Sequence, residues 1–130
     1  MACSRVGLSE QLWKIKQPYN VSVAAQAAAV ASLAVADELR ARVQAIVAER
    51  ERLFQHLNTF PFLTPFPSVA NFILCRVEGR DARELKLALE RRGVLVRHYQ
   101  TPLLNGYIRI SVGTPAQTDA LIAMLAEVTR

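Results

Sequence analysis

The chain is poor in cysteine, histidine and glycine, and each shortage limits the chemistry that we expect from it. Its 130 residues include two cysteines, two histidines and five glycines. Cys3 and Cys75 have no metal-ligand spacing to His56 or His98, so we predict no metal site. Cys75 lies in an apolar run. This setting predicts a buried free thiol and favours a reducing, cytoplasmic compartment.

Familiar catalytic motifs are also missing from the sequence. The glycines form no phosphate-binding loop, and no Ser/His/Asp or Cys/His arrangement stands out. The only lysines are Lys14, Lys16 and Lys86. Lys14 and Lys16 lie in a short amphipathic segment, where a solvated ammonium is a simpler interpretation than a Schiff-base amine. From the residues alone we therefore predict no catalytic group.

Arginine dominates the charge of the chain. All but three of its 16 basic residues are arginine, and the formal net charge is +5. A planar guanidinium suits carboxylate or phosphate, because it donates two parallel hydrogen bonds. A GC-rich coding bias would give the same composition. The densest basic run is the pair Arg91-Arg92, which argues against a nucleic-acid partner.

One long apolar run, Val21 to Ala36, follows a basic stretch and could be mistaken for a signal peptide. It is rich in alanine, contains Gln26 and is slightly short for a membrane span, so we expect a packed helix and no membrane partner. Ser22 is its expected N-cap, and a second, longer helix begins at Asp37. The apolar residues of that second helix recur with a period of 3.6: Val43, Ile46, Val47, Leu53, Phe54 and Leu57.

The rest of the chain predicts short strands and helices. Three prolines between residues 61 and 67 permit an edge strand at 62–66 at most. Further strands are expected at 71–77, 94–97 and 107–112, and helices after the N-caps Asp81 and Thr114. The predicted fold is α+β. Two long N-terminal helices precede a β-α-β-β-α domain with a mainly antiparallel sheet covered by helices.

Arg109 is the residue that best suggests binding. Alternation along its strand places Arg109 on the face opposite Ile108 and Ile110. A half-buried arginine needs a partner, because an unpaired buried charge is costly. That partner could be a ligand or an acidic side chain of the protein. Surface exposure is a third possibility.

A second arginine could share the same site. Arg97 ends the preceding strand, and the intervening loop is short enough for antiparallel pairing with the strand of Arg109. Two guanidinium groups converging on one point suit a carboxylate or phosphate. His98 could act as an acid or base, although a surface position is the simpler interpretation. Asn71 and Tyr19 could equally serve only to stabilise turns.

Four segments together resemble the C-terminal part of histidinol-phosphate aminotransferases, which are pyridoxal-phosphate enzymes of fold type I. They are Lys16-Gln-Pro-Tyr-Asn-Val21, Ala70-Asn-Phe-Ile-Leu74, Gly93-Val-Leu-Val-Arg97 and Ile108-Arg-Ile-Ser-Val-Gly-Thr114. The resemblance covers residues 9–130 and extends to threonine-phosphate decarboxylases. It implies a role in histidine biosynthesis. It divides the chain into a large-domain remnant (1–20), connecting helices (21–58) and the small domain (59–130).

The resemblance also implies roles for individual residues. Arg109 matches the arginine that binds the substrate carboxylate, and Arg97 matches a second arginine for the substrate anion. Tyr19 and Asn71 match positions near the active site. Arg5 matches an arginine that meets the phosphate of the cofactor, although Leu8-Ser9 departs from the family pattern after it. The implied ligand is therefore a small-molecule anion.

The catalytic lysine of the family and the aspartate that pairs with the pyridinium nitrogen have no counterpart here. We therefore expect that the chain alone does not bind pyridoxal phosphate and is inactive. A free-standing anion- or protein-binding module is the alternative. An RNA-binding sheet would need more exposed aromatic residues than Phe72 and Tyr107. The N-terminal helices would expose apolar surface, so we expect a homo-oligomer.

Overall fold

The computed structural model describes residues 6–16 and 19–128, with side chains described from residue 10. The chain divides into two compact units, Met1–Leu39 and Arg40–Arg130. The first unit contains α1 (Val6–Ile15) and α2 (Val23–Leu33), and α3 (Ala36–Leu57) begins at its end. The expected N-cap of α2 is confirmed, because the Ser22 hydroxyl accepts a hydrogen bond from the Ala25 amide at 3.1 Å. None of the described helices is long and apolar enough to cross a membrane.

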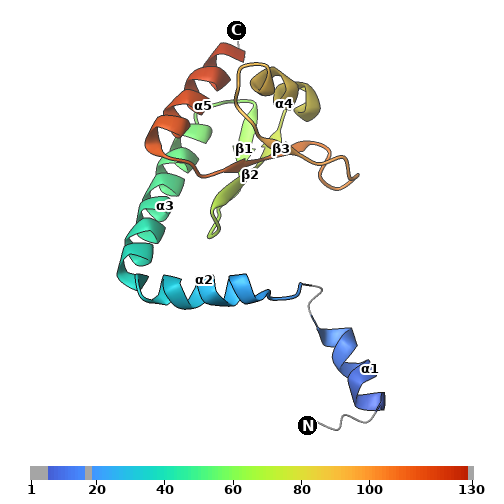
Figure 1. Cartoon of the computed structure of the whole chain (residues 1–130). Coiled ribbons are helices and arrows are strands. Elements are labelled where there is room, and N and C mark those ends of the chain that lie inside the picture. Colours follow the sequence, from blue (N-terminus) through green and yellow to red (C-terminus); the bar gives the residue numbers. More distant parts are fainter. Residues whose placement is uncertain (1–5, 17–18, 129–130) are drawn as a thin grey trace. The chain divides into compact units, whose positions relative to one another are not determined.

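The second unit is built on a four-stranded antiparallel sheet with the order β1-β2-β4-β3. Figure 1 shows helices α4 and α5 beside this sheet. Its elements after α3 are β1 (Leu63–Pro65), β2 (Phe72–Val77), α4 (Ala82–Glu90), β3 (Arg97–His98), β4 (Tyr107–Ser111) and α5 (Pro115–Val128). The α+β fold, the antiparallel sheet and the short edge strand are as the sequence predicts. Both later N-caps are confirmed: Asp81 accepts from the Glu84 amide, and Thr114 and Gln117 bond each other reciprocally.

Strand β3 is shorter than the expected strand at 94–97. Gly93 ends α4 with φ +81°, a conformation that side chains rarely adopt. The Val94 amide then donates to the Leu89 carbonyl at 3.0 Å and closes the end of the helix. Val94 therefore belongs to the end of the helix, and the hydrogen-bonded pairing of β3 with β4 begins only at Arg97.

One face of the sheet carries the core. Ile73, Cys75, Ile108 and Ile110 are buried on this face, with Cys75 as the expected buried free thiol. The C-terminal part of α3, together with α4 and α5, contributes the facing core side chains: Leu53, Leu57, Ala82, Leu85, Leu89, Leu121 and Leu125. Side chains on the other sheet face remain partly exposed or exposed. The sheet therefore has a closed face and an open face.

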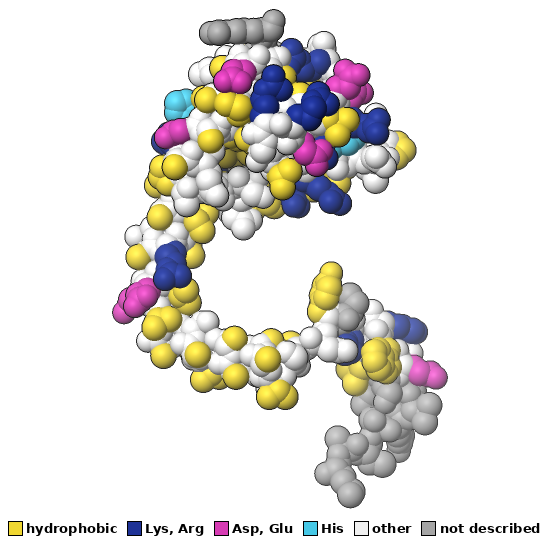
Figure 2. Space-filling view, turned by 45° about the horizontal axis from the view of Figure 1, so that its top comes forward, with side chains coloured by type: hydrophobic (Ala, Val, Ile, Leu, Met, Phe, Trp, Pro, Cys, Tyr) yellow, Lys and Arg dark blue, Asp and Glu magenta, His cyan; other side chains and the backbone are white. Residues whose placement is uncertain are grey.

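The apolar stripe of α3 is only partly buried. Leu53 and Leu57 are 1% and 0% exposed, whereas Val43 and Val47 are 58% and 41% exposed. In α2 no residue is buried. Figure 2 shows hydrophobic side chains spread over the surface of this helix. The expectation of exposed apolar surface on the N-terminal helices is confirmed for the residues that the structure describes.

Candidate functional site

Arg97 and Arg109 lie directly opposite each other on the open face of the sheet. Strand β3 pairs with β4 in antiparallel register, with Arg97 opposite Arg109 and His98 opposite Ile108. Directly opposed residues of an antiparallel pair have Cβ atoms about 5 Å apart. The expected antiparallel pairing of the two strands is confirmed. It brings two guanidinium-bearing side chains to one place.

Neither arginine has a carboxylate partner among the described residues. No hydrogen bond or ion pair is formed by either guanidinium there, and the Nε of Arg109 is buried without an acceptor. Instead, the Arg109 guanidinium carbon lies 5.1 Å from the Phe72 ring centre, and that of Arg97 lies 5.6 Å from the Tyr99 ring centre. Like charges placed directly opposite are destabilising. Within the part of the chain that the structure describes, neither arginine therefore has a structural ion pair.

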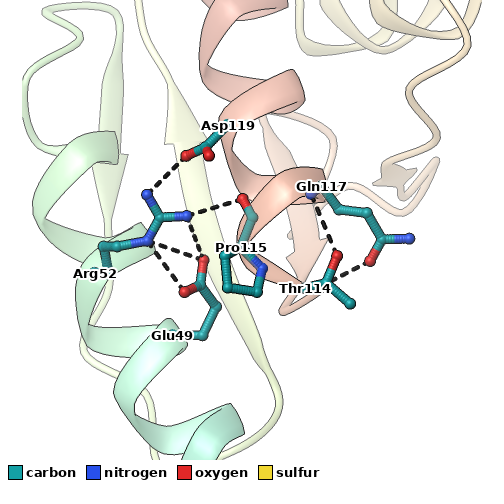
Figure 3. Close-up of polar contacts among 6 residues, drawn as sticks. All are labelled: Glu49, Arg52, Thr114, Pro115, Gln117 and Asp119. Carbon is teal, nitrogen blue, oxygen red and sulfur yellow. Dashed lines mark hydrogen bonds and ion pairs between the residues drawn. The ribbon is translucent and has the colours of Figure 1, made fainter.

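Arg52, in contrast, is an arginine with a structural role, because its guanidinium is bound by other residues of the protein (Figure 3). Its Nη2 donates to Glu49 Oε1 at 2.8 Å and to the Pro115 carbonyl at 2.9 Å, and its Nη1 donates to Asp119 Oδ1 at 2.7 Å. These bonds tie the C-terminal half of α3 to the start of α5. Because its donors are occupied by the protein, Arg52 is unsuited to bind a ligand.

The Glu49–Arg52 pair predicts an acid-sensitive contribution to stability. Glu49 is buried, and the hydrogen bonds from Arg52 lower the pKa of its carboxyl below the ordinary value. A carboxyl with a lowered folded pKa stabilises the fold above its unfolded pKa and loses that contribution as pH falls through the folded pKa. We expect Glu49→Gln to flatten the loss of unfolding free energy as the pH falls below about 4.3, the ordinary pKa of glutamate. Urea unfolding over this range measures it, and an unchanged acid limb would contradict the assignment.

The other predicted site residues do not join the arginine pair. His98 is opposite Ile108 in the ladder, and its Nε2 lies 2.8 Å from the Asn105 carbonyl oxygen. Asn71 is exposed at the start of β2, where its carbonyl accepts from the Val112 amide at 2.9 Å. Tyr19 is 82% exposed in the first unit. Arg5 lies outside the described residues. Within the unit Arg40–Arg130, the strand register brings Arg97 and Arg109 together.

Two further residues of the site were missed by sequence reasoning. Phe72 is two residues from Leu74, which pairs with Arg109, and is therefore the diagonal neighbour of that arginine. Tyr99 follows Arg97 by two residues. The spacing was a usable signal, because period-two neighbours share a face of a strand. However, an aromatic residue in a strand is equally typical of a core, so the spacing alone did not distinguish the two.

The described lysines all contact polar side chains. Lys14 bonds Gln11 at 3.0 Å, Lys16 bonds Asn20 at 2.8 Å, and Lys86 pairs with Glu90. These contacts lie on α1, just after it, and on α4. The described residues contain no cluster of histidine, cysteine and carboxylates that could hold a metal.

Comparison with known proteins agrees with the resemblance. The model of the family "Aminotransferase class I and II" matches residues 2–125. Histidinol-phosphate aminotransferase 1, chloroplastic, of Arabidopsis thaliana is 50% identical over 123 residues, covering 94% of this chain and 30% of the relative. The histidinol-phosphate aminotransferase of Roseiflexus castenholzii is 52% identical over 120 residues, covering 90% and 32%.

A solved structure gives the same result. The crystal structure of histidinol-phosphate aminotransferase from Sinorhizobium meliloti in complex with pyridoxal-5'-phosphate matches with a TM-score of 0.70 and 31% identity. The match covers 94% of this chain and 34% of that one. The chain spans about a third of the length of these relatives. It therefore belongs to the class I and II aminotransferases, a pyridoxal-phosphate-dependent family of fold type I, and is similar to part of the histidinol-phosphate aminotransferases.

Proposed function

We propose that this chain is the substrate-anion-binding small domain of a histidinol-phosphate-type aminotransferase and corresponds to the C-terminal part of that enzyme. The observation that carries the proposal is the pair Arg97 and Arg109, which are opposed on the open sheet face and have no carboxylate partner among the residues that the structure describes. Residues 59–130 form the small domain in this proposal, 21–58 connect it, and 1–20 belong to the large domain. Arg5, Tyr19 and Asn71 are its further proposed contacts.

The substrate of the proposed enzyme explains why two arginines are useful. Histidinol phosphate carries a phosphate and no carboxylate, whereas the amino-group partner of the reaction is a dicarboxylate. Guanidinium forks bind both oxyanions through charge-assisted hydrogen bonds. The half-desolvated setting of Arg109 strengthens such bonds, because the competing water is partly excluded. One site can therefore receive either anion in turn.

Catalysis requires groups that this sequence does not supply on the arginine face. When bound, pyridoxal phosphate would provide the electron sink of the reaction, and a lysine would have to hold it. We expect the purified chain to retain no pyridoxal phosphate after gel filtration and to show no transamination with glutamate. Mixing it with a separately produced large domain of a close relative should restore both. Activity of the chain by itself would overturn this part of the proposal.

We also expect the chain to self-associate. Its exposed apolar side chains on α2 and α3 include Val23, Val30, Leu33, Val43 and Val47. Contiguous exposed apolar surface favours association with a second copy. Sedimentation equilibrium should show a mass that rises with concentration, and replacing Val30 and Leu33 by Gln should lower it. A monomer at every concentration would contradict the expectation.

A free-standing module without catalysis is the second candidate. It is favoured by the packing of the unit Arg40–Arg130, because helices of this unit cover the apolar face of its sheet and give it a core of its own. Anion binding without any rescue of transamination would support it. Under either proposal the ligand is a small molecule, and neither a membrane nor a nucleic acid is a partner. A cytoplasmic location stays a prediction, since some relatives are named as chloroplastic.

A further inference from the structure

An aromatic ring lies close to each guanidinium of the pair Arg97 and Arg109. The Arg109 guanidinium carbon is 5.1 Å from the centre of the Phe72 ring, and the Arg97 carbon is 5.6 Å from that of Tyr99. The face of an aromatic ring attracts a cation. It does not accept conventional hydrogen bonds from the N–H groups at the edge of the guanidinium. A ring therefore holds a guanidinium in place and leaves its N–H donors available.

Two other arginines of this unit are held by carboxylates. Arg52 is bound by Glu49 and Asp119, and Arg76 is bound by Glu78 at 2.7 Å. A carboxylate holds an arginine firmly, but it also occupies the donors that an incoming anion would use. Arg97 and Arg109 have the rings in place of carboxylates. Their support is thus compatible with binding a second, external anion.

Phe72 is placed to fix the direction of the Arg109 fork. It is the diagonal neighbour of Arg109 across the β2–β4 ladder, and its ring is only partly exposed. The Nε of Arg109 is buried and without an acceptor, so the stem of the guanidinium is enclosed by protein. Protein contacts around the stem and on one face of the guanidinium restrict the rotamers of Arg109 before a ligand binds. Binding therefore costs less side-chain entropy.

We propose that Phe72 is a positioning residue for Arg109, and that Tyr99 has the same role for Arg97. Each ring lies against a guanidinium that has no described acceptor, and the opposed strand positions of Arg97 and Arg109 suit a shared compact oxyanion such as phosphate. This inference rests on the proposed function and deepens it, because it assigns the preorientation of the anion site to two aromatic side chains.

The test uses inorganic phosphate and the full 130-residue chain. Phe72→Leu removes the ring but keeps an apolar side chain, and we expect it to weaken phosphate binding about two- to tenfold. Phe72→Tyr retains the ring and should bind phosphate as the parent chain does. Phe66→Leu is the matched control, because Phe66 packs against Tyr107 at 6.1 Å between ring centres and forms no cation–π contact among the described residues. It should leave the affinity unchanged.

A second readout separates this inference from the proposed function. The Arg109 Nε–Hε resonance should carry a ring-current shift in the parent chain and in Phe72→Tyr, and should lose it in Phe72→Leu. If the parent binds no phosphate, the anion-binding function is overturned whatever the resonance does. If the parent binds phosphate but Phe72→Leu binds it equally well, or if its Arg109 resonance does not move, the role of Phe72 alone is overturned.

Discussion

Arg109→Ala is expected to weaken phosphate binding by about ten- to a hundredfold, because hydrogen bonds to charged groups contribute about 1.5–3 kcal/mol. The residue projects from the middle strand pair onto the open face and has no competing acceptor among the described residues. Arg109→Lys should reduce the phosphate affinity nearly as much as Arg109→Ala does, since an ammonium keeps the charge and loses the planar fork. Isothermal titration with inorganic phosphate measures both variants.

Arg76→Ala is the matched control for this prediction. Arg76 lies in the same ladder, opposite Tyr107, but is bound by Glu78 at 2.7 Å. We expect its removal to leave the phosphate affinity unchanged. An equal loss in both variants would mean that binding follows net charge, and the assignment to Arg109 would fail.

Leu57→Ala is expected to lower the free energy of unfolding by about 2–5 kcal/mol, because it opens a cavity in a close-packed core. Leu57 is 0% exposed and lies where the end of α3 meets the sheet and the helices that cover it. Such a loss is a large fraction of the stability of a small domain. Urea unfolding at a concentration where the chain is monomeric measures it.

Val43→Ala, on the same apolar stripe of α3, provides the comparison. Val43 is 58% exposed, so its truncation should change the unfolding free energy by less than about 0.5 kcal/mol. Together the two variants separate the part of α3 that belongs to the core from the part that does not. Equal losses would show that the first half of the stripe is also buried in the monomer.

The sequence predicts the local features of this fold well, because their causes are local. The caps Ser22, Asp81 and Thr114 depend on residues at most three positions away, and all three form the expected hydrogen bonds. Alternation along β4 and the short loop after Arg97 likewise indicate that two arginines could meet. The register of β3 and β4 places them opposite each other.

Features that depend on what covers a surface could not be predicted in this way. Periodicity identifies the apolar stripe of α3, but it does not say that Leu53 is buried while Val43 is exposed. The length of β3 depends on a hydrogen bond between Val94 and Leu89 that no pattern indicates. The support of Arg109 by Phe72 depends on a diagonal contact between strands, which requires the register to be known.

The most direct test of the anion site follows the Nε–Hε resonances of Arg97 and Arg109 during one phosphate titration. If both guanidinium groups bind the same anion, the two resonances should shift together and give a single dissociation constant. In a one-to-one complex, both guanidinium groups report the same binding equilibrium, so their titration curves must have the same midpoint. Resonances that saturate at different phosphate concentrations, or an Arg97 resonance that stays in place while Arg109 shifts, would contradict a shared site.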